Sequence, residues 1–341
     1  IRTSGTPGTA GATASGTVAV PTGSASATGL SPNTTYTLYV RTDCGSGSFS
    51  SWTQLVFTTP CNATNIPYIM DFVSLTAPAL PSCTSVETLN SGNTWETENA
   101  PGYGFTGNAM VYNYNSSSPA DTWFYTQGLN LTAGTAYKLA YRYNAAGTTY
   151  VEDMNVNFGT APSAAAMTNT LALHTSISNN STAPYVDEIS FTPSATGVYY
   201  IGFHAFSAAD QFNLYVDSIN VTLCSTPSVM ASASLPSVCA GQTFTLTGTG
   251  AATTYSWSSG ATTAVTTTSA SANSTYTLTS TNVCGASTST VDVTVNQLPA
   301  VSATASSTLL CSNFGESAVL TASTTATTYS WSNGDATMST T

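Results

Sequence analysis

Short runs of alternating apolar and polar residues recur along the chain, and almost nothing follows the period of a helix. The runs are rich in Thr, Val and Tyr, and Gly, Asn, Ser or Pro bound each of them. Because alternation with period two separates the two faces of an extended strand, these runs predict the short strands of all-β sandwich domains. The clearest runs are TYTLYVRT at 35–42, TFTLTGT at 243–249, TYTLTST at 275–281 and STVDVTV at 289–295.

One Ala-rich stretch, APSAAAMTNTLALH at 161–174, departs from this alternation. It is short for an independently stable helix, because isolated helices below about 12–15 residues are marginal in water. The stretch therefore predicts a loop or a single helical turn.

The hexapeptide TTYSWS occurs at 253–258 and again at 327–332, and both copies follow a Cys, a Gly and an apolar run in the same order. Self-similarity at the length of one sandwich domain indicates tandem domains. The repeat predicts an immunoglobulin-like domain at 225–296 and the start of a second, incomplete one at 297–341. In each, TTYSWS is the strand that inserts a Trp, Trp257 or Trp331, between the sheets.

Residues 1–60 end in GLSPNTTYTLYVRTDCGSGSFSSWTQLVFTT. Leu30, Pro32, Tyr36 and the alternating strand after them resemble the later half of a fibronectin type III domain. In that family the Leu and Tyr hold the penultimate strand, and here VFTT would close the last strand. The resemblance implies the C-terminal part of such a domain at 1–60.

Residues 61–224 carry a longer series of apolar segments that ends in GFHAFSAADQFNLYVDSINV. Their order resembles the jelly-roll module of bacterial cleaved adhesins and the related MAM domains, and the closing segment is the most specific part of the match. The resemblance implies a two-sheet β-sandwich. The earlier segments are IPYIMDF, LPSCTSVE, NTWETENAPGYGFTGNAMVYNYN and DTWFYTQGLNLTAGTAYKLAYRYN.

Composition narrows the classes of partner. Only 6% of the 341 residues are charged, yet 41% are hydrophobic, which is enough apolar surface to fold. The net charge is −11 and the chain has four cationic residues, too few to neutralise a run of phosphates or to dock on anionic lipid. No apolar run reaches the ~18 residues of a membrane span. We therefore expect no nucleic-acid partner and no membrane insertion by this segment.

The seven cysteines are widely spaced and form no CxxC motif, which favours disulfides in an oxidising exterior over a metal site. Cys239 stands at the start of the first immunoglobulin-like strand and Cys284 in the hairpin NVCGA, so we predict a Cys239–Cys284 bond. Cys311 repeats Cys239, so its partner is expected beyond Thr341.

The pairing of the other four cysteines follows less directly. A strand of about 3.3 Å per residue separates Cys44 from Cys61, too far for a disulfide, so the partner of Cys44 is expected upstream of Ile1. Cys61, Cys83 and Cys224 remain for at most one bond, and the sequence leaves the choice among them open.

Catalytic patterns are weak. His174 and His204 are the only histidines, and neither lies near a nucleophile motif such as G-x-S-x-G. Glu96 and Glu98 share a strand face, but glycosidases take their two acids from opposite sides of a cleft. We expect the two glutamates on a solvated strand edge and predict that the segment is not an enzyme.

A calcium site is implied by the resemblance to cleaved adhesins and MAM domains, whose jelly rolls commonly bind Ca²⁺ between the first and last strands. Asp71 and Asp217 are the residues expected to take part, because Ca²⁺ prefers oxygen ligands. The sequence departs from the family pattern at Ser218, where a second acid is lost, and at Val73, where an acid is expected. The alternative is a metal-free, hydrogen-bonded core.

Tyrosines are abundant in the jelly-roll region. Tyr112 and Tyr114 share one strand face, as do Tyr141 and Tyr143, and a flat strip of tyrosines can stack on sugar rings. The alternative is that they are core residues and cross-strand pairs. The whole set is Tyr112, Tyr114, Tyr125, Tyr137, Tyr141, Tyr143 and Tyr150.

Two functions fit these modules. The combination resembles large adhesins of gliding Bacteroidota that the type IX system exports, which implies an extracellular or cell-surface protein acting in attachment and gliding motility. Its partners would be surface glycans, other cell-surface proteins, or the secretion and motility machinery. The alternative is the non-catalytic, carbohydrate-binding or spacer region of a secreted protease or polysaccharide hydrolase. Assembly into a filament is a third hypothesis.

Overall fold

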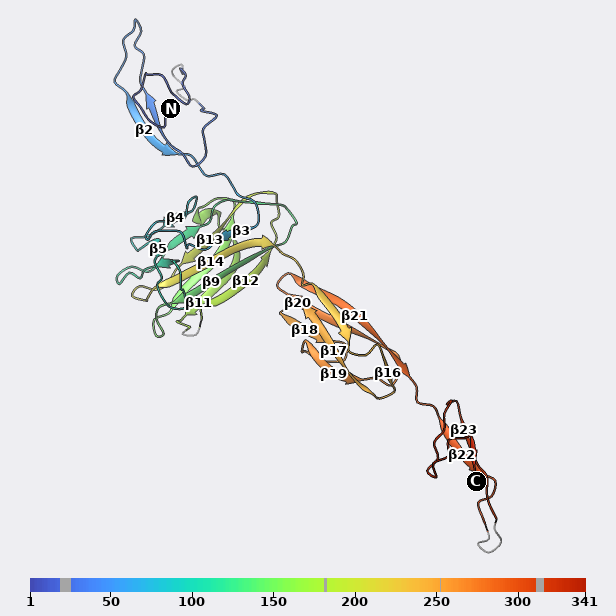
Figure 1. Ribbon diagram of the computed structural model, residues 1–341. Coiled ribbons are helices and arrows are strands. Elements are labelled where there is room, and N and C mark those ends of the chain that lie inside the picture. Colours follow the sequence, from blue (N-terminus) through green and yellow to red (C-terminus); the bar gives the residue numbers. More distant parts are fainter. Residues whose placement is uncertain (19–25, 181–182, 252, 311–315) are drawn as a thin grey trace. The chain divides into compact units, whose positions relative to one another are not determined.

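The computed structural model describes residues 1–18, 26–180, 183–251, 253–310 and 316–341, and nearly all of its regular structure is β-strand (Figure 1). One 3₁₀ turn, η1 (Ala164–Ala166), lies in the Ala-rich stretch, as predicted, but the second half of that stretch belongs to a strand, β11 (Asn169–Ile177). The all-β prediction is confirmed. Across the described ranges, no helix is long and apolar enough to cross a membrane.

The chain divides into two compact units, Ile1–Ser225 and Thr226–Thr341. The first unit begins with an antiparallel pair, β1 (Thr35–Val40) and β2 (Thr53–Thr58). Tyr36 is the buried residue of this pair, and its hydroxyl accepts a hydrogen bond from the Ser31 N–H at 2.8 Å. A tyrosine that bonds back to the backbone just upstream of its strand is a known device for fixing a sandwich corner.

Two six-stranded sheets build the rest of the first unit. In one, the strand order is β11-β10-β13-β7-β4, with β8 also pairing β13; in the other it is β12-β9-β14-β6-β5, with β3 also pairing β14. The remaining strands of the first sheet are β4 (Ser85–Thr88), β7 (Thr122–Tyr125), β8 (Leu129–Leu131), β10 (Glu152–Gly159) and β13 (Gly197–Ala205). Those of the second are β3 (Tyr68–Met70), β5 (Trp95–Glu98), β6 (Ala109–Tyr112), β9 (Tyr137–Ala145), β12 (Tyr185–Phe191) and β14 (Leu214–Leu223).

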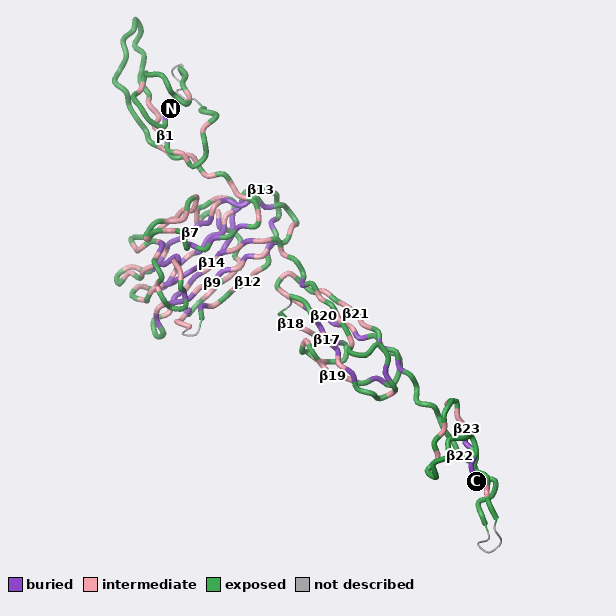
Figure 2. Tube along the Cα trace, viewed as in Figure 1, coloured by how far each residue is buried: buried purple, intermediate pink, exposed green. Residues whose placement is uncertain are grey.

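The core of this sandwich lies between the two sheets, where Figure 2 shows the buried strands. Period-two alternation places Leu139 and Val216 of one sheet against Phe124 and Phe203 of the other, and all four are fully buried. Burial of one such side chain contributes about 1.5–3 kcal/mol. The packing joins the two sheets into one rigid scaffold, from whose ends the connections project.

The second unit contains a complete sandwich. One sheet has the order β15 (Val229–Ala233), β17 (Thr243–Gly250), β19 (Val265–Ser269), and the other β16 (Ser237–Cys239), β21 (Gly285–Asn296), β20 (Ser274–Asn282), β18 (Thr254–Trp257). Trp257 is buried between these sheets with Phe244 and Leu278, as the TTYSWS motif predicts.

The repeat recurs in the structure. Strands β22 (Val301–Ala305), β23 (Leu320–Thr324) and β24 (Ser339–Thr340) form a sheet in the same order as β15, β17 and β19. The Trp257 indole N–H donates to the carbonyl of Thr263 at 3.1 Å, and the Trp331 indole N–H donates to Thr337, also six residues on, at 2.8 Å. The two TTYSWS copies therefore fix the same local turn.

The predicted Cys239–Cys284 disulfide is wrong. Cys239 is an exposed free thiol, whereas Cys284 is disulfide-bonded, as is Cys224. Strand β16 pairs in parallel with β21 and places Cys239 opposite Asn296, at the far end of β21 from Cys284. Twelve residues of β21 at roughly 3.3 Å each put the two cysteines on the order of 35 Å apart, far beyond the reach of a disulfide.

The remaining cysteines include one disulfide pair and one free thiol. Cys61 and Cys83 form a disulfide with a Cα–Cα distance of 5.5 Å, which settles a pairing that the sequence left open. Cys44 is an exposed free thiol. Cys311 lies outside the described residues, so its partner stays a prediction.

Candidate functional site

The predicted strip of tyrosines is wrong for two of its four members. Tyr112 and Tyr141 keep only 2% and 1% of their surface and belong to the core between the sheets. Tyr112 packs edge-on against Trp95, and Tyr141 packs edge-on against Phe203 of the opposite sheet. Inner strands of a sandwich bury their inward-facing rings, so neither tyrosine can contact a ligand.

Tyr141 instead forms a polar contact between the edges of the two sheets. Its hydroxyl donates to Asp187 on β12 at 3.0 Å and lies 2.6 Å from Nε2 of His174 on β11. Burial raises the pKa of Tyr141 and lowers the pKa of His174, so both are neutral at pH 7. Tyr143 also belongs to this group, because its ring centroid lies 4.3 Å from that of His174 and 5.2 Å from that of Tyr185. This arrangement holds the sandwich together.

Tyr114 is different, because the structure places it in an exposed row of aromatic rings. Its ring stacks on Phe212 with centroids 5.8 Å apart, and Phe212 stacks on Tyr150 at 5.4 Å. The three side chains keep 43%, 41% and 47% of their surface exposed. We call Tyr114, Phe212 and Tyr150 the aromatic row. Clustered exposed rings on a charge-poor surface mark a binding site more often than isolated ones do.

The strand register explains why these residues meet. Tyr114 lies in the β6–β7 connection, Tyr150 in β9–β10 and Phe212 in β13–β14. The first residue of β14, Leu214, pairs with the last residue of β6 on one side and with the last residue of β9 on the other. The three connections therefore leave the sandwich at one end.

Backbone and amide hydrogen bonds hold the connections together. Asn213 accepts the Tyr114 N–H through its side-chain oxygen at 3.3 Å, and Gln211 accepts the Val151 N–H at 3.0 Å. The Asp210 N–H donates to the Asn115 carbonyl at 2.9 Å. The β13–β14 connection thus bonds to both of its neighbours and brings Phe212 between Tyr114 and Tyr150.

The border of the row is formed by neutral amides. Asn93 donates to the carbonyls of Asn113 and Tyr114 at 3.1 and 2.9 Å and accepts a hydrogen bond from the Asn115 amide at 3.3 Å. None of the four cationic residues of the chain lies in the three connections that carry the row. The surface therefore offers ring faces and amide groups without a positive charge, and the exposed Asp210 is an anion in the β13–β14 connection.

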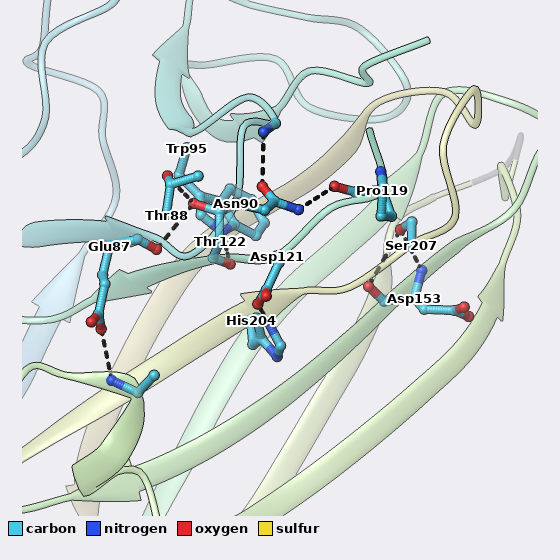
Figure 3. A network of polar contacts seen from close by, with 12 residues as sticks. Glu87, Thr88, Asn90, Trp95, Pro119, Asp121, Thr122, Asp153, His204 and Ser207 are labelled. Atoms are coloured by element: carbon cyan, nitrogen blue, oxygen red, sulfur yellow. Dashed lines mark hydrogen bonds and ion pairs between the residues drawn. The ribbon is translucent and has the colours of Figure 1, made fainter. Parts of the chain in front are cut away.

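A polar network joins the β6–β7 connection to β13 and the β13–β14 connection to β10 (Figure 3). His204 on β13 contacts Asp121 at 2.9 Å, and its ring stacks on Trp123 at 4.3 Å. Burial lowers the pKa of His204, which opposes the effect of Asp121. Both histidines thus contact carboxylates and aromatic rings, which gives each a structural role. Further bonds in the network join Asn90 to Pro119, Thr88 to Thr122, and Trp95 to Thr122.

The sequence-predicted calcium residues also come together. Asp71 directly follows β3, and β3 pairs with β14 just beyond a bulge that begins at Asp217. Asp217 Oδ1 is buried without a hydrogen-bond partner, and Oδ2 lies 3.9 Å from the Arg142 guanidinium. Burial raises the pKa of Asp217, and the nearby Asp71 raises it further. Val73, where an acid was expected, is largely exposed. Within the described ranges, no three His, Cys, Asp or Glu side chains gather in a metal-binding cluster.

The sequence singled out Tyr114 but not its two partners in the row. Phe212 lies inside the segment that carries the cleaved-adhesin resemblance, and Tyr150 was one tyrosine among many. Because the three residues are far apart in the chain and come from irregular connections, no periodicity links them. The usable signal was an aromatic residue in each of three connections between predicted strands.

Solved structures similar to the chain include adhesin and carbohydrate-binding modules. The K1 and K3 cleaved adhesin domains of Lys-gingipain from Porphyromonas gingivalis W83 are 18% and 20% identical, with TM-scores of 0.39 and 0.36. Each match covers 46% of this chain and 98% or 96% of the domain. The C-terminal CBM6 of LamC from Zobellia galactanivorans is 14% identical, with a TM-score of 0.29, over 46% of this chain and 98% of the module.

No protein-family model and no curated protein sequence matches the chain. Likeness at these identities and TM-scores assigns neither a ligand nor an activity, because one sandwich fold serves many functions.

Proposed function

We propose that the chain is part of an extracellular adhesive protein and that residues 61–224 bind neutral glycans through the aromatic row. The observation that carries the proposal is the exposed stack of Tyr114, Phe212 and Tyr150 within a border of amide groups. Ring faces pack on the apolar C–H faces of sugars, while amides bond to their hydroxyls. The absence of cations from these connections favours neutral over acidic glycans.

The setting of this module supports an adhesive protein at the outer cell surface. Disulfide-bonded cysteines are typical of proteins outside the cytosol, and tandem sandwiches suit a stalk that presents a binding site. We extend the proposal to export by the type IX system and a part in gliding motility, on the resemblance given above. The alternative is the carbohydrate-binding or spacer region of a secreted protease or polysaccharide hydrolase. The complete open reading frame separates the two, because a catalytic domain within it would overturn the adhesin proposal.

Substitution of the central ring tests the glycan site. Phe212→Ala should weaken binding of a neutral hexasaccharide by at least about 30-fold, since removing a central aromatic contact typically costs about 2 kcal/mol or more. The probes are cellohexaose, laminarihexaose and mannohexaose, with hexagalacturonate as the acidic counterpart, measured by isothermal titration calorimetry on the full chain.

Phe49→Ala is the matched control, because Phe49 is as exposed as the row but lies in the β1–β2 connection. Binding that survives Phe212→Ala and Tyr150→Ala unchanged would place the glycan site elsewhere. Tighter binding of hexagalacturonate than of the neutral probes would contradict the proposed ligand class.

We also propose that Asp71 and Asp217 hold a Ca²⁺ that ties β3 to β14. The buried, unpartnered Oδ1 of Asp217 fits a cation ligand, and a cation would relieve the repulsion between the two carboxylates. The ion would supply a structural cross-link between the first and last strands of the second sheet of this sandwich.

A further inference from the structure

Glu152 is a carboxylate buried beneath the aromatic row. It is the first residue of β10, two positions after Tyr150, and none of its surface is exposed. A buried carboxylate normally needs a cation or a full set of hydrogen-bond donors to offset its lost hydration. Glu152 has no such full set, because its Oε1 atom is buried without a partner.

The donors that Glu152 does have both belong to the β13–β14 connection. Its Oε2 accepts a hydrogen bond from Ser207 Oγ at 2.5 Å, and the backbone N–H of Phe212 faces the carboxyl group and lowers its pKa. Ser207 is anchored in turn by the Asp153 N–H at 2.8 Å, a contact visible in Figure 3. One carboxyl group thus holds both ends of the segment that presents Phe212.

The electrostatic surroundings favour the neutral acid. The titratable groups that interact with Glu152 are Asp153, its neighbour on β10, and Tyr112 on β6, and neither supplies positive charge. Burial and the charge of Asp153 raise the pKa of Glu152 to about 7, against the opposing hydrogen bonds from Ser207 and Phe212. Burial raises the pKa of Tyr112 to about 12, so Tyr112 stays neutral.

We propose that Glu152 is a positioning residue that makes glycan binding by the aromatic row depend on its protonation. The neutral acid keeps its buried site and holds Phe212 in the row. The ionised carboxylate needs further donors for Oε1, and it obtains them from water only if the 206–213 connection opens. This inference rests on the proposed function of the row and adds its regulation by pH.

The expected size of the pH effect on binding follows from the fraction of molecules in which Glu152 is protonated. With a pKa of about 7, roughly nine-tenths of the molecules carry the neutral acid at pH 6 and about one-tenth at pH 8. Apparent affinity scales with the fraction of molecules that are competent to bind. Binding should therefore weaken by about tenfold between pH 6 and pH 8.

Two measurements on the full chain test this. Calorimetry with the three neutral hexasaccharides compares the wild-type protein with Glu152→Gln, which is permanently neutral, and with Glu188→Gln on β12, whose carboxylate pairs with Lys138, as the matched control. The amide resonance of Phe212 is followed by NMR over the same pH range without any sugar. We expect about tenfold weakening in the wild-type protein and in Glu188→Gln, tight binding at every pH in Glu152→Gln, and a Phe212 amide that titrates only when Glu152 is present.

Wild-type binding that does not change with pH, or a pH dependence that persists in Glu152→Gln, would overturn the regulation and leave the glycan site intact. If no sugar binds at any pH, the proposed function fails and the regulation of binding fails with it. In that case the amide titration alone tests the positioning role. A Phe212 resonance that does not change with pH overturns that role too.

Discussion

Glu152→Gln is expected to abolish most of the loss of stability that the jelly-roll sandwich suffers between about pH 4.5 and pH 7. The folded state binds a proton at Glu152 more tightly than the unfolded chain does, because burial raises its pKa from 4.5 to about 7. Its contribution is therefore fully present below pH 4.5 and is lost as the pH rises through the folded-state pKa. At 1.36 kcal/mol per unit, the pH-dependent part amounts to about 3 kcal/mol.

Other groups titrate in the same range, so the comparison must be between two proteins. The lowered pKa values of His174 and His204 give the opposite slope, with stability that is lost as the pH falls below about 6.5. These contributions are common to the wild type and the variant and cancel in the difference. The difference in unfolding free energy between the two proteins is measured by denaturant unfolding of the full chain. NMR signals of β10 and β13 report the unfolding of this sandwich, and signals of β20 and β21 serve as the internal control. A difference in unfolding free energy that stays constant from pH 4 to pH 8 would show that folding does not raise the pKa of Glu152.

Chelation of calcium should destabilise the same sandwich. An ion that binds only the folded state stabilises it by about 2.7 kcal/mol at a concentration 100-fold above its dissociation constant. For a unit of this size, that corresponds to a loss of roughly 5–10 °C in melting temperature. Asp217→Asn should reproduce the loss in the presence of calcium. Melting of the sandwich in the second unit should not change, since its sole carboxylate in 225–296 is Asp292.

The control for the calcium experiment is Asp210→Asn, which removes a carboxylate from the β13–β14 connection without touching β3 or the bulge of β14. Superimposable melting curves with calcium and with chelator would contradict the proposed site. Asp71 would then be an exposed residue beside β3, and Asp217 a buried carboxylate whose charge the Arg142 guanidinium balances.

The local sequence pattern predicted those features of the fold that depend on local interactions. Alternation located β1, β17, β20 and β21, and the repeated TTYSWS placed Trp257 in the core. The Cys239–Cys284 prediction failed because it depended on a non-local pairing. The parallel alignment of β16 with β21 decides which end of a long strand lies near Cys239, and no residue within either segment encodes that alignment.

The same limit applies to the candidate site. Shared strand faces gave Tyr112 with Tyr114 and Tyr141 with Tyr143, but whether a face is buried depends on the sheet packed against it. The row itself joins three connections through the pairing of β14 with both β6 and β9. Likewise, Glu152 reads in the sequence as half of an acidic pair, and only the packed β13–β14 connection shows it buried.

Chemical-shift mapping tests the glycan site most directly. Titration of the isotopically labelled full chain with a neutral hexasaccharide should perturb the ring and amide signals of Tyr114, Tyr150 and Phe212, and those of the bordering Asn93 and Asn115. Sugar C–H protons should move upfield, because they lie over aromatic faces. Perturbations centred on any other surface, or sugar signals that stay in place while the protein signals move, would contradict the account.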